Sequence, residues 1–324
     1  MSKFYVGIDV GGTTIKYGIF DGNKKLIGKH AVKTIITKKS PEKNLIKNIL
    51  DSLEEYCKCN KHGMTKANIA GIGFDIPGPV VNNQVLRAVN INWNHKYYIV
   101  KETKRRFGNK VSVRVINDAN AATIGEYSKT LKAKYKNVCL MTLGTALGTG
   151  VIINNKLIEG KTGIAGAICH TRVDYEKDAI KCKCGNTGCL ETIVSGRGIA
   201  NAYKRLYLKN KSKNDVIKIG EYKVKVSELE AMHVIRAAKK KDKKALKALT
   251  FSLDYMADAI AMIMHVYEPE VVLIGGGVSK EGPILTQIVN KCLKEKIFIT
   301  KKLPKIMLAK LKNDAGIYGV VQNL

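Results

Sequence analysis

Residues 4–20 read FYVGIDVGGTTIKYGIF, and this stretch decides the fold. An apolar run ends at Asp9, two glycines and two threonines follow, and a second apolar run begins at Ile15. Apolar runs on both sides of a glycine-containing turn predict two strands joined by a hairpin. We expect these strands at 3–9 and 15–20.

The same pattern returns at residues 137–154, NVCLMTLGTALGTGVIIN. Here we expect a strand over 137–143, a Gly/Thr loop over 144–150 and a strand over 151–154. Strand, Gly/Thr turn and strand therefore occur twice. Two related halves with a cleft between them would explain this repeat.

Strands and helices alternate along the rest of the chain, which favours an α/β fold with mixed sheets. The lysine-rich segment 209–226 is expected to be a surface excursion. We expect further strands at 26–33, 69–74, 111–116 and 271–274, helices at 41–56, 100–107, 119–127, 198–207 and 243–267, and a last helix after Asn313-Asp314.

The formal net charge of +29 is large for a chain of 324 residues. Only eight of its 56 basic residues are arginines, and the lysines are scattered through the whole chain. The densest stretch, 204–247, lacks the interleaved aromatic residues of a nucleic-acid stacking platform. We expect a solvated basic surface and no nucleic-acid partner.

No segment has the composition of a signal peptide or a membrane span. The longest apolar stretch, 257–267, is interrupted by Asp258 and His265 and is shorter than the ~20 residues that cross a bilayer. The first residues, MSKFYVGIDV, lack a long apolar segment. We expect a cytoplasmic protein without a membrane partner.

The first Gly/Thr turn has the chemistry of a phosphate loop. Gly11 and Gly12 let the backbone approach a phosphate, whose oxygens the free N–H groups can bind. The hydroxyl groups of Thr13 and Thr14 add donors, and a carboxylate at the strand end, Asp9, can lie near a hydrated Mg²⁺. The spacing is not that of a Walker motif. An ordinary hairpin turn is the alternative, and the second copy of the pattern argues against it.

Two further polar or glycine-rich sites follow predicted strands. Asn117-Asp118 ends an apolar strand, where ligands of such sheets bind. An aspartate there can accept the proton of a hydroxyl during phosphoryl transfer, although Asp118 could equally be a helix cap. Gly275-Gly276-Gly277 would let a flat group such as adenine lie against the backbone, or it is only a tight turn into a helix.

The strongest local signal is His170 followed by Cys182, Cys184 and Cys189. Three thiolates and one imidazole suit a tetrahedral structural Zn²⁺ site, and clustered cysteines in a cytoplasmic chain suggest a metal before a disulfide. The alternative is a chance cluster of reduced cysteines.

Taken together, these segments resemble the ROK family of sugar kinases and repressors, in the family's order from Asp9 to Gly319. The most specific part runs from His170 to Glu191 and ends Gly-Cys-Leu-Glu. The resemblance implies a two-lobed actin-like, ribonuclease H-like ATPase fold with a central cleft. We expect a small lobe of residues 1–118 plus 313–324 and a large lobe of residues 119–312 that carries the zinc loop.

The resemblance also implies an ATP-dependent hexose kinase that uses Mg²⁺ and acts on glucose at its 6-hydroxyl, and a homodimer. Asp118 would be the general base. His170 would hold zinc with one ring nitrogen and reach the sugar with the other. The residues implied for nucleotide and cofactor binding are Asp9, Gly11, Gly12, Thr13, Thr14, Lys16, Gly144, Thr145, Gly275, Gly276, Gly277 and Asp314. Those implied for the sugar are Pro77, Gly78, Asn90, Asn117, Asp118, His170 and Glu191.

The sequence departs from the family's pattern at three positions near these residues. The mildest is Ala146, which replaces a frequent glycine of the second phosphate loop. Ala167 stands where the family's run Gly-Glu-x-Gly-His has a glutamate that accepts hydrogen bonds from the sugar. A sugar-binding sensor or weakened kinase is therefore the alternative to an active enzyme. Asp75 stands where a small residue is common, and could add a carboxylate to the pocket. A repressor of the same family would carry a helix-turn-helix domain before the first strand, which is expected here by Lys3.

Overall fold

The computed structural model describes residues 3–59 and 61–324. Its backbone divides into two compact units. The first unit comprises the chain up to Lys134, together with Leu157–Gly166 and Asn313–Leu324. The second unit comprises Tyr135–Lys156 and Ala167–Lys312.

A five-stranded mixed sheet forms the centre of the first unit, in the order β3-β2-β1-β4-β7. Strands β1, β2 and β3 are antiparallel neighbours, while β1, β4 and β7 run parallel. The strands are β1 (Phe4–Val10), β2 (Thr14–Phe20), β3 (Leu26–Lys33), β4 (Ile69–Ile76) and β7 (Ser112–Asn117). The strands expected from the sequence are present, with ends that differ by a few residues.

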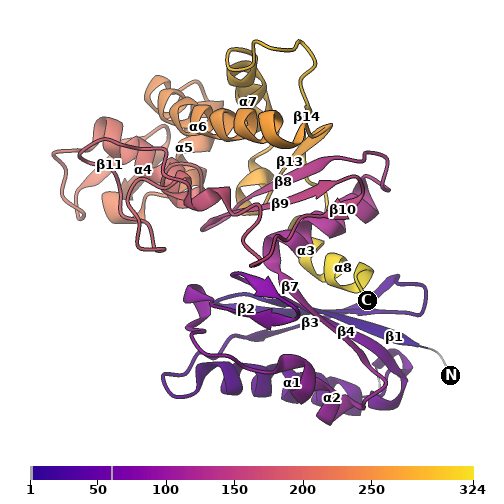
Figure 1. The fold of residues 1–324 in the computed structure, drawn as a ribbon. Coiled ribbons are helices and arrows are strands. Elements are labelled where there is room, and N and C mark those ends of the chain that lie inside the picture. The colour runs from indigo at the N-terminus through magenta and orange to yellow at the C-terminus, as the bar shows by residue number, and fades with distance from the viewer. Residues whose placement is uncertain (1–2, 60) are drawn as a thin grey trace. The chain divides into compact units, whose positions relative to one another are not determined.

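Helices cover both faces of this sheet (Figure 1). Helices α1 (Pro41–Lys58) and α2 (Ile99–Phe107) lie on one face, and α3 (Asp118–Gly125) and α8 (Ala315–Gln322) lie on the other. The first face buries the apolar side of α1 in a large core that includes Leu45 and Ile49. The second face is a smaller core in which Val320 packs with Phe20.

The first unit extends beyond the boundary expected at residue 118 because α3 packs closely against α8. A Cβ on Gly125 would overlap the carbonyl oxygen of Ala315, and one on Gly319 would overlap that of Ala121. Only glycine permits this separation of the two backbones. Helix α3 and the π-helical turn Glu126–Thr130 that follows it therefore belong with the C-terminal helix.

The second unit contains a sheet with the corresponding strand order, β10-β9-β8-β13-β14. Strands β8 and β9 are antiparallel, as β1 and β2 are, and β8, β13 and β14 run parallel. The strands are β8 (Val138–Leu143), β9 (Leu147–Ile153), β10 (Lys156–Leu157), β13 (Val271–Gly275) and β14 (Lys305–Leu308). Each Gly/Thr turn joins the two central antiparallel strands of its own sheet, so the repeat inferred from the sequence is a repeat of topology.

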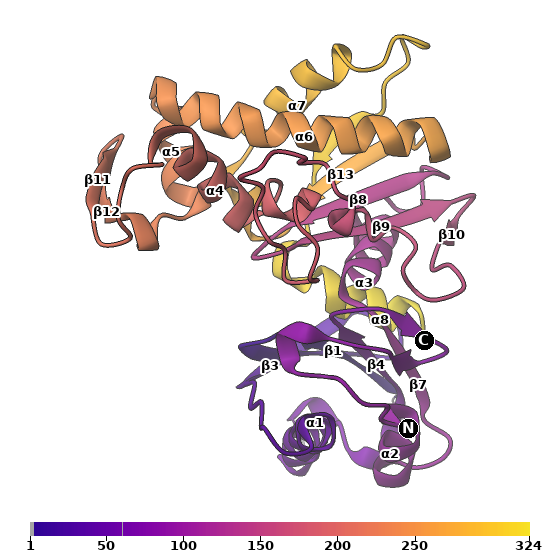
Figure 2. The same cartoon turned by 60° about the vertical axis from the view of Figure 1, so that its left-hand side comes forward.

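Helices α6 (Lys243–Tyr267) and α7 (Ile284–Lys294) lie against one face of the second sheet (Figures 1 and 2). Helices α4 (Gly196–Tyr207) and α5 (Ala231–Lys239) pack beside α6. The bounds of α6 match those expected, while α5, α7 and β14 were not predicted.

Segment 209–226, expected to be a surface excursion, contains the hairpin of β11 (Val216–Ile219) and β12 (Tyr222–Lys225). Its Ile219 is fully buried, and Gly220 lies against Ala237 of α5. The lysines of this segment are exposed between these apolar positions. Its composition therefore predicted a surface segment without a buried part.

Within the described chain, α6 is long and apolar enough to cross a membrane by length and composition. Just over half of its most apolar window, 56%, is buried in this fold. The core helix of a globular protein has the same properties, and Leu249, Met256 and Ile260 of α6 are fully buried.

Candidate functional site

The turn between β1 and β2 leaves backbone donors open at its tip. The N–H of Gly11 donates to the carbonyl oxygen of Thr14 at 3.1 Å, which closes the turn. Thr34 holds it from the side: its N–H donates to the oxygen of Thr13, and its hydroxyl donates to that of Gly11 at 2.7 Å. Gly12 and Thr13 remain exposed. The turn can therefore bind an anion without breaking the hydrogen bonds that hold its own backbone.

Polar side chains meet at the carboxyl ends of the parallel strands of the first unit. Asp9 near the end of β1 is the register partner of Asp75 on β4, and Ile76 pairs with Asn117 on β7. The Nζ of Lys16 lies 2.6 Å from the Oδ2 of Asp9. This edge of the sheet therefore carries the predicted Asp9, Lys16 and Asn117 together, as expected for a ligand site of an α/β sheet.

Asn117, not Asp118, is the N-cap of α3. The Oδ1 of Asn117 accepts hydrogen bonds from the N–H groups of Ala119 and Asn120, at 2.9 and 3.1 Å. The interpretation of Asp118 as the helix cap is therefore wrong. The Oδ1 of Asp118 accepts from the Nδ2 of Asn117 and the N–H of Ala119, both at 2.9 Å. No described residue donates a hydrogen bond to its Oδ2, which leaves this oxygen for a further partner.

The Asp118 carboxyl group keeps contact with solvent although protein atoms surround it. Desolvation is the largest influence on its pKa, and the charge of Asp9 acts in the same direction, so the pKa lies above its usual value. The hydrogen bonds from Ala119 and Asn117 oppose this rise. A carboxylate with a raised pKa is a better acceptor for a hydroxyl proton.

Asp75 is almost fully buried, with 1% of its surface exposed. Its Oδ2 has no hydrogen-bond partner among the described residues. Burial, followed by the charges of Asp9 and Asp118, raises its pKa well above the usual range. This carboxyl group faces the start of α8 at Gly316, so it is enclosed by protein instead of lining an open pocket.

A short closed loop presents Asn90 beside the first Gly/Thr turn. Ala88 and Trp93 exchange backbone hydrogen bonds at 2.9 and 3.0 Å, and the carbonyl oxygen of Asn90 lies 3.4 Å from the Cβ position of Gly12. The buried Glu42 of α1 holds the end of this loop, because its Oε1 accepts from the N–H groups of Asn94 and His95. Sequence reasoning missed Glu42, since a glutamate in the first turn of a helix carries no sign of a distant partner.

Gly78, which follows Pro77 after β4, lies in the same region. It has a φ of 98° and accepts a hydrogen bond from the Nδ2 of Asn117 at 3.0 Å. Asp314, expected near the adenosine, is also in the first unit. Its Oδ2 accepts a hydrogen bond from the Nζ of Lys29 at 2.5 Å.

The second Gly/Thr turn and the triple glycine adjoin each other in the second unit. The N–H of Gly144 donates to the oxygen of Ala146 at 3.0 Å, and Thr145 is exposed at the tip. Gly276 has a φ of 78°, and a Cβ there would come within 2.5 Å of the oxygen of Leu143. Glycine is therefore required where β13 turns away beside the end of β8.

A pocket of about 620 Å³ opens next to these two loops. Thr145 and Gly277 line it, together with side chains of α4 and α5. Arg197 also lines it, and sequence reasoning missed this residue because the helix was expected to begin at Gly198. A pocket of this size accommodates a small organic ligand.

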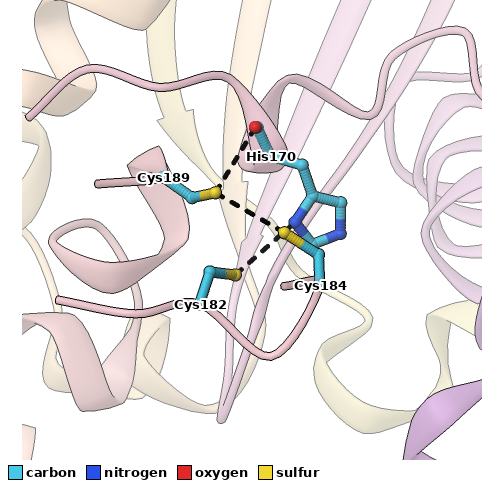
Figure 3. A group of neighbouring side chains, drawn as sticks. All are labelled: His170, Cys182, Cys184 and Cys189. Carbon is cyan, nitrogen blue, oxygen red and sulfur yellow. Dashed lines mark hydrogen bonds between the residues drawn. The ribbon is translucent and has the colours of Figure 1, made fainter. Parts of the chain in front are cut away.

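The cysteine cluster lies in the second unit, where the four predicted ligands point toward one another (Figure 3). The Nδ1 of His170 is 3.8 Å from the Sγ of Cys182, and the Sγ atoms of Cys184 and Cys189 are 3.6 Å apart. All four candidate ligand atoms lie within 4.8 Å of one another. Bonds of about 2.3 Å in a tetrahedron place neighbouring ligands about 3.8 Å apart, so the cluster fits Zn²⁺. Burial raises the pKa of the Cys182 and Cys189 thiols, and a bound cation would favour their thiolate forms.

Glu191 connects this cluster to the second Gly/Thr turn. Its Oε2 accepts from the N–H of Leu147 at 3.2 Å, while its Oε1 is 3.8 Å from the Sγ of Cys182. The sugar contacts expected of Glu191 and His170 involve residues of both units and stay predictions, as does the opposition of the two Gly/Thr turns.

Comparison with known proteins agrees with these features. The model of the ROK family matches residues 5–322. A glucokinase of Halalkalibacterium halodurans is 34% identical over 328 aligned positions, which cover 98% of this chain and 93% of that protein. An N-acetyl-D-glucosamine kinase of Histophilus somni is 29% identical, with 97% of each chain covered.

Among solved structures, the ROK family glucokinase of Streptomyces griseus in complex with glucose and AMPPNP has a TM-score of 0.76 to this chain. The two are 27% identical, and the match covers 99% of this chain and 98% of that one. The expected kinase fold of the actin-like, ribonuclease H-like class is therefore confirmed.

Proposed function

Because the chain belongs to the ROK family, we propose that it is an ATP-dependent kinase that transfers the γ-phosphate of ATP to a hydroxyl group of a hexose. One observation carries the proposal for the chemistry. The carboxyl groups of Asp9 and Asp118 lie at the ends of parallel strands beside a glycine-threonine turn with open donors, and this turn has a second copy in the other unit.

In the proposed reaction, Asp118 acts as the general base. Its Oδ1 is held by Asn117 and Ala119, and its Oδ2 accepts the hydrogen of the sugar hydroxyl. As the hydroxyl oxygen bonds to the γ-phosphorus, the bond from that phosphorus to the β-γ bridging oxygen of ATP breaks. The proton passes to Asp118, and ADP leaves with the bridging oxygen. A raised pKa makes the transfer of this proton more favourable.

The glycine-threonine turns position the nucleotide in this proposal. The exposed Gly12, Thr13 and Thr145 would donate hydrogen bonds to phosphate oxygens, and Lys16, whose Nζ lies 2.6 Å from the Oδ2 of Asp9, would hold that carboxyl group in position. The Mg²⁺ ion that accompanies ATP neutralises phosphate charge. The pocket beside Gly277 is our candidate for the adenosine part, and we infer that zinc at His170 and the three cysteines keeps the Glu191 segment folded.

Glucose, phosphorylated at the 6-hydroxyl, is the proposed acceptor. Relatives named glucokinase and N-acetyl-D-glucosamine kinase support a hexose of this kind. Ala167 lacks the carboxylate that the family's pattern leads us to expect, so we infer a looser fit around part of the sugar. The sensor alternative is not favoured, because Asp118 and both glycine-threonine turns are present. We propose a cytoplasmic homodimer on the resemblance alone.

Turnover of ATP measured against a panel of hexoses tests the function. We expect turnover with glucose, and with related hexoses at higher KM values. Sugar-dependent thermal stabilisation without turnover for any sugar would refute the kinase and support the sensor.

A further inference from the structure

Helix α4 begins against the second Gly/Thr turn. The side chain of Ser195 caps the helix by accepting from the N–H of Gly198 at 3.0 Å. The N–H of Gly196 donates to the carbonyl oxygen of Gly144 at 2.7 Å, and a Cβ on Gly196 would come equally close to that oxygen. Glycine is therefore needed for this approach. The next residue, Arg197, is placed directly beside the turn.

The guanidinium group of Arg197 has one hydrogen bond and one longer ion-pair contact with the described residues. Its Nε donates to the carbonyl oxygen of Thr145 at 3.0 Å. Its Nη2 is 3.7 Å from the Oε1 of Glu191, which is an ion-pair distance but too long for a hydrogen bond. Among the residues that the structure describes, the Nε bond is the one hydrogen bond of this group. The Nη donors are therefore oriented and still available to a ligand, and 44% of the side chain is exposed.

The wall around Arg197 has an excess of positive charge. The pocket of about 620 Å³ that contains Thr145 and Arg197 is also lined by Lys181, Lys183 and Lys204. Burial lowers the pKa of Lys204, so a bound anion would stabilise its charged form.

The carboxylates of the same pocket offset only part of this charge. Glu281 forms ion pairs with Arg236 and Lys239 at 3.0 and 2.9 Å. Glu191 is buried, accepts the backbone N–H of Leu147 and lies at ion-pair distance from Arg197, and Glu230 is the remaining acidic side chain of the wall. An arginine whose Nη groups have no hydrogen bond to a described residue, beside a turn of the phosphate-loop type, matches the oxygen atoms of a phosphate group.

We propose that Arg197 is a binding residue for the phosphate chain of the nucleotide donor. The Nε bond to Thr145 fixes the plane of the guanidinium group, and the Nη groups donate to phosphate oxygens. This inference rests on the proposed kinase function and adds to it a residue that recognises the phosphates rather than the base.

Binding of ATP and of adenosine to the full chain, each measured by calorimetry without sugar, tests this role. The variants are Arg197→Ala and Arg197→Lys, with Arg105→Ala as the control. Arg105 is an exposed arginine of the first unit that forms an ion pair with Glu102. We expect Arg197→Ala to weaken ATP binding by about 10-fold or more, the usual effect of losing a charge-assisted hydrogen bond. Adenosine binding should stay within about 2-fold, because adenosine has no phosphate.

Lysine at this position should restore part of the ATP affinity, since it supplies the charge without the fork of donors. The KM for ATP should rise in both variants while the KM for the sugar stays constant. ATP affinity that is unchanged in Arg197→Ala, or ATP and adenosine affinities that fall equally, would overturn the inference alone. A wild-type protein that binds no ATP would instead refute the proposed function itself.

Discussion

The carboxyl group of Asp75 lies directly against the backbone of Gly316. A Cβ atom on Gly316 would lie 3.0 Å from the Cγ of Asp75 and would overlap its Oδ2. Asp75 is the second-last residue of strand β4 and Gly316 is the second residue of helix α8, so the contact joins segments far apart in the sequence. A buried acid at this position is therefore compatible with the fold only if residue 316 has no side chain.

Replacing Gly316 with alanine should destabilise the protein by about 1–3 kcal/mol, the usual cost of adding a methyl group to a filled core. Thermal and urea unfolding measure this change. Gly277→Ala is the control, because a Cβ at Gly277 would meet no atom within 4 Å. The double variant Asp75→Ala with Gly316→Ala should recover part of the loss. If the changes in unfolding free energy of the two single variants simply add up in the double variant, the contact between Asp75 and Gly316 is contradicted.

The Asp75→Asn variant should change how stability depends on pH. Burial raises the pKa of Asp75 in the folded protein, so above the unfolded value of 3.8 the folded state retains a proton that the unfolded chain releases. The wild-type stability should therefore fall, relative to the variant, as pH rises from about 4 through the folded pKa. The difference between the two melting temperatures, measured at constant ionic strength, should widen over this range. If the melting temperatures of the two proteins change in parallel with pH, the prediction of a raised pKa for Asp75 is wrong.

The local features of the fold could be predicted where short stretches decide them. The Gly/Thr turns, the helix opened by Pro41 and the long helix α6 depend on apolar periodicity within a few turns. The four residues of the cysteine cluster could be predicted because their spacing is itself the signal.

Features that depend on distant partners could not be predicted. Which of Asn117 and Asp118 caps α3 is decided by backbone angles, since both side chains are good caps. The place of α3 in the first unit depends on the glycines that allow its contact with α8. Arg197 and Glu42 act through backbone atoms of other loops, which no sequence pattern marks.

Removal of one cysteine of the cluster should remove the metal. Cys184→Ser should reduce zinc from about one ion per chain to a small fraction and lower the melting temperature, because metal binding and local folding are coupled. Cys59→Ser is the matched control, since Cys59 is also exposed but lies outside the cluster. Metal analysis of both variants, purified without chelator, measures the outcome. Equal zinc contents, or none in the wild-type protein, would count against the site.

Replacing Asp118 with asparagine should abolish turnover while sugar binding persists. Asparagine keeps the size of the side chain and can still accept from Asn117 and Ala119 through its oxygen, but its amide cannot take a proton. Loss of a general base lowers kcat by about 10²–10⁴-fold. Turnover of ATP with glucose measures the rate, and calorimetry with glucose measures binding. The control is Asp51→Asn, a partly exposed carboxylate of α1 that pairs with Lys47. A near wild-type kcat in Asp118→Asn would show that Asp118 is not the general base. Among the described residues of the first unit, Asp118 is the exposed aspartate that directly follows β7.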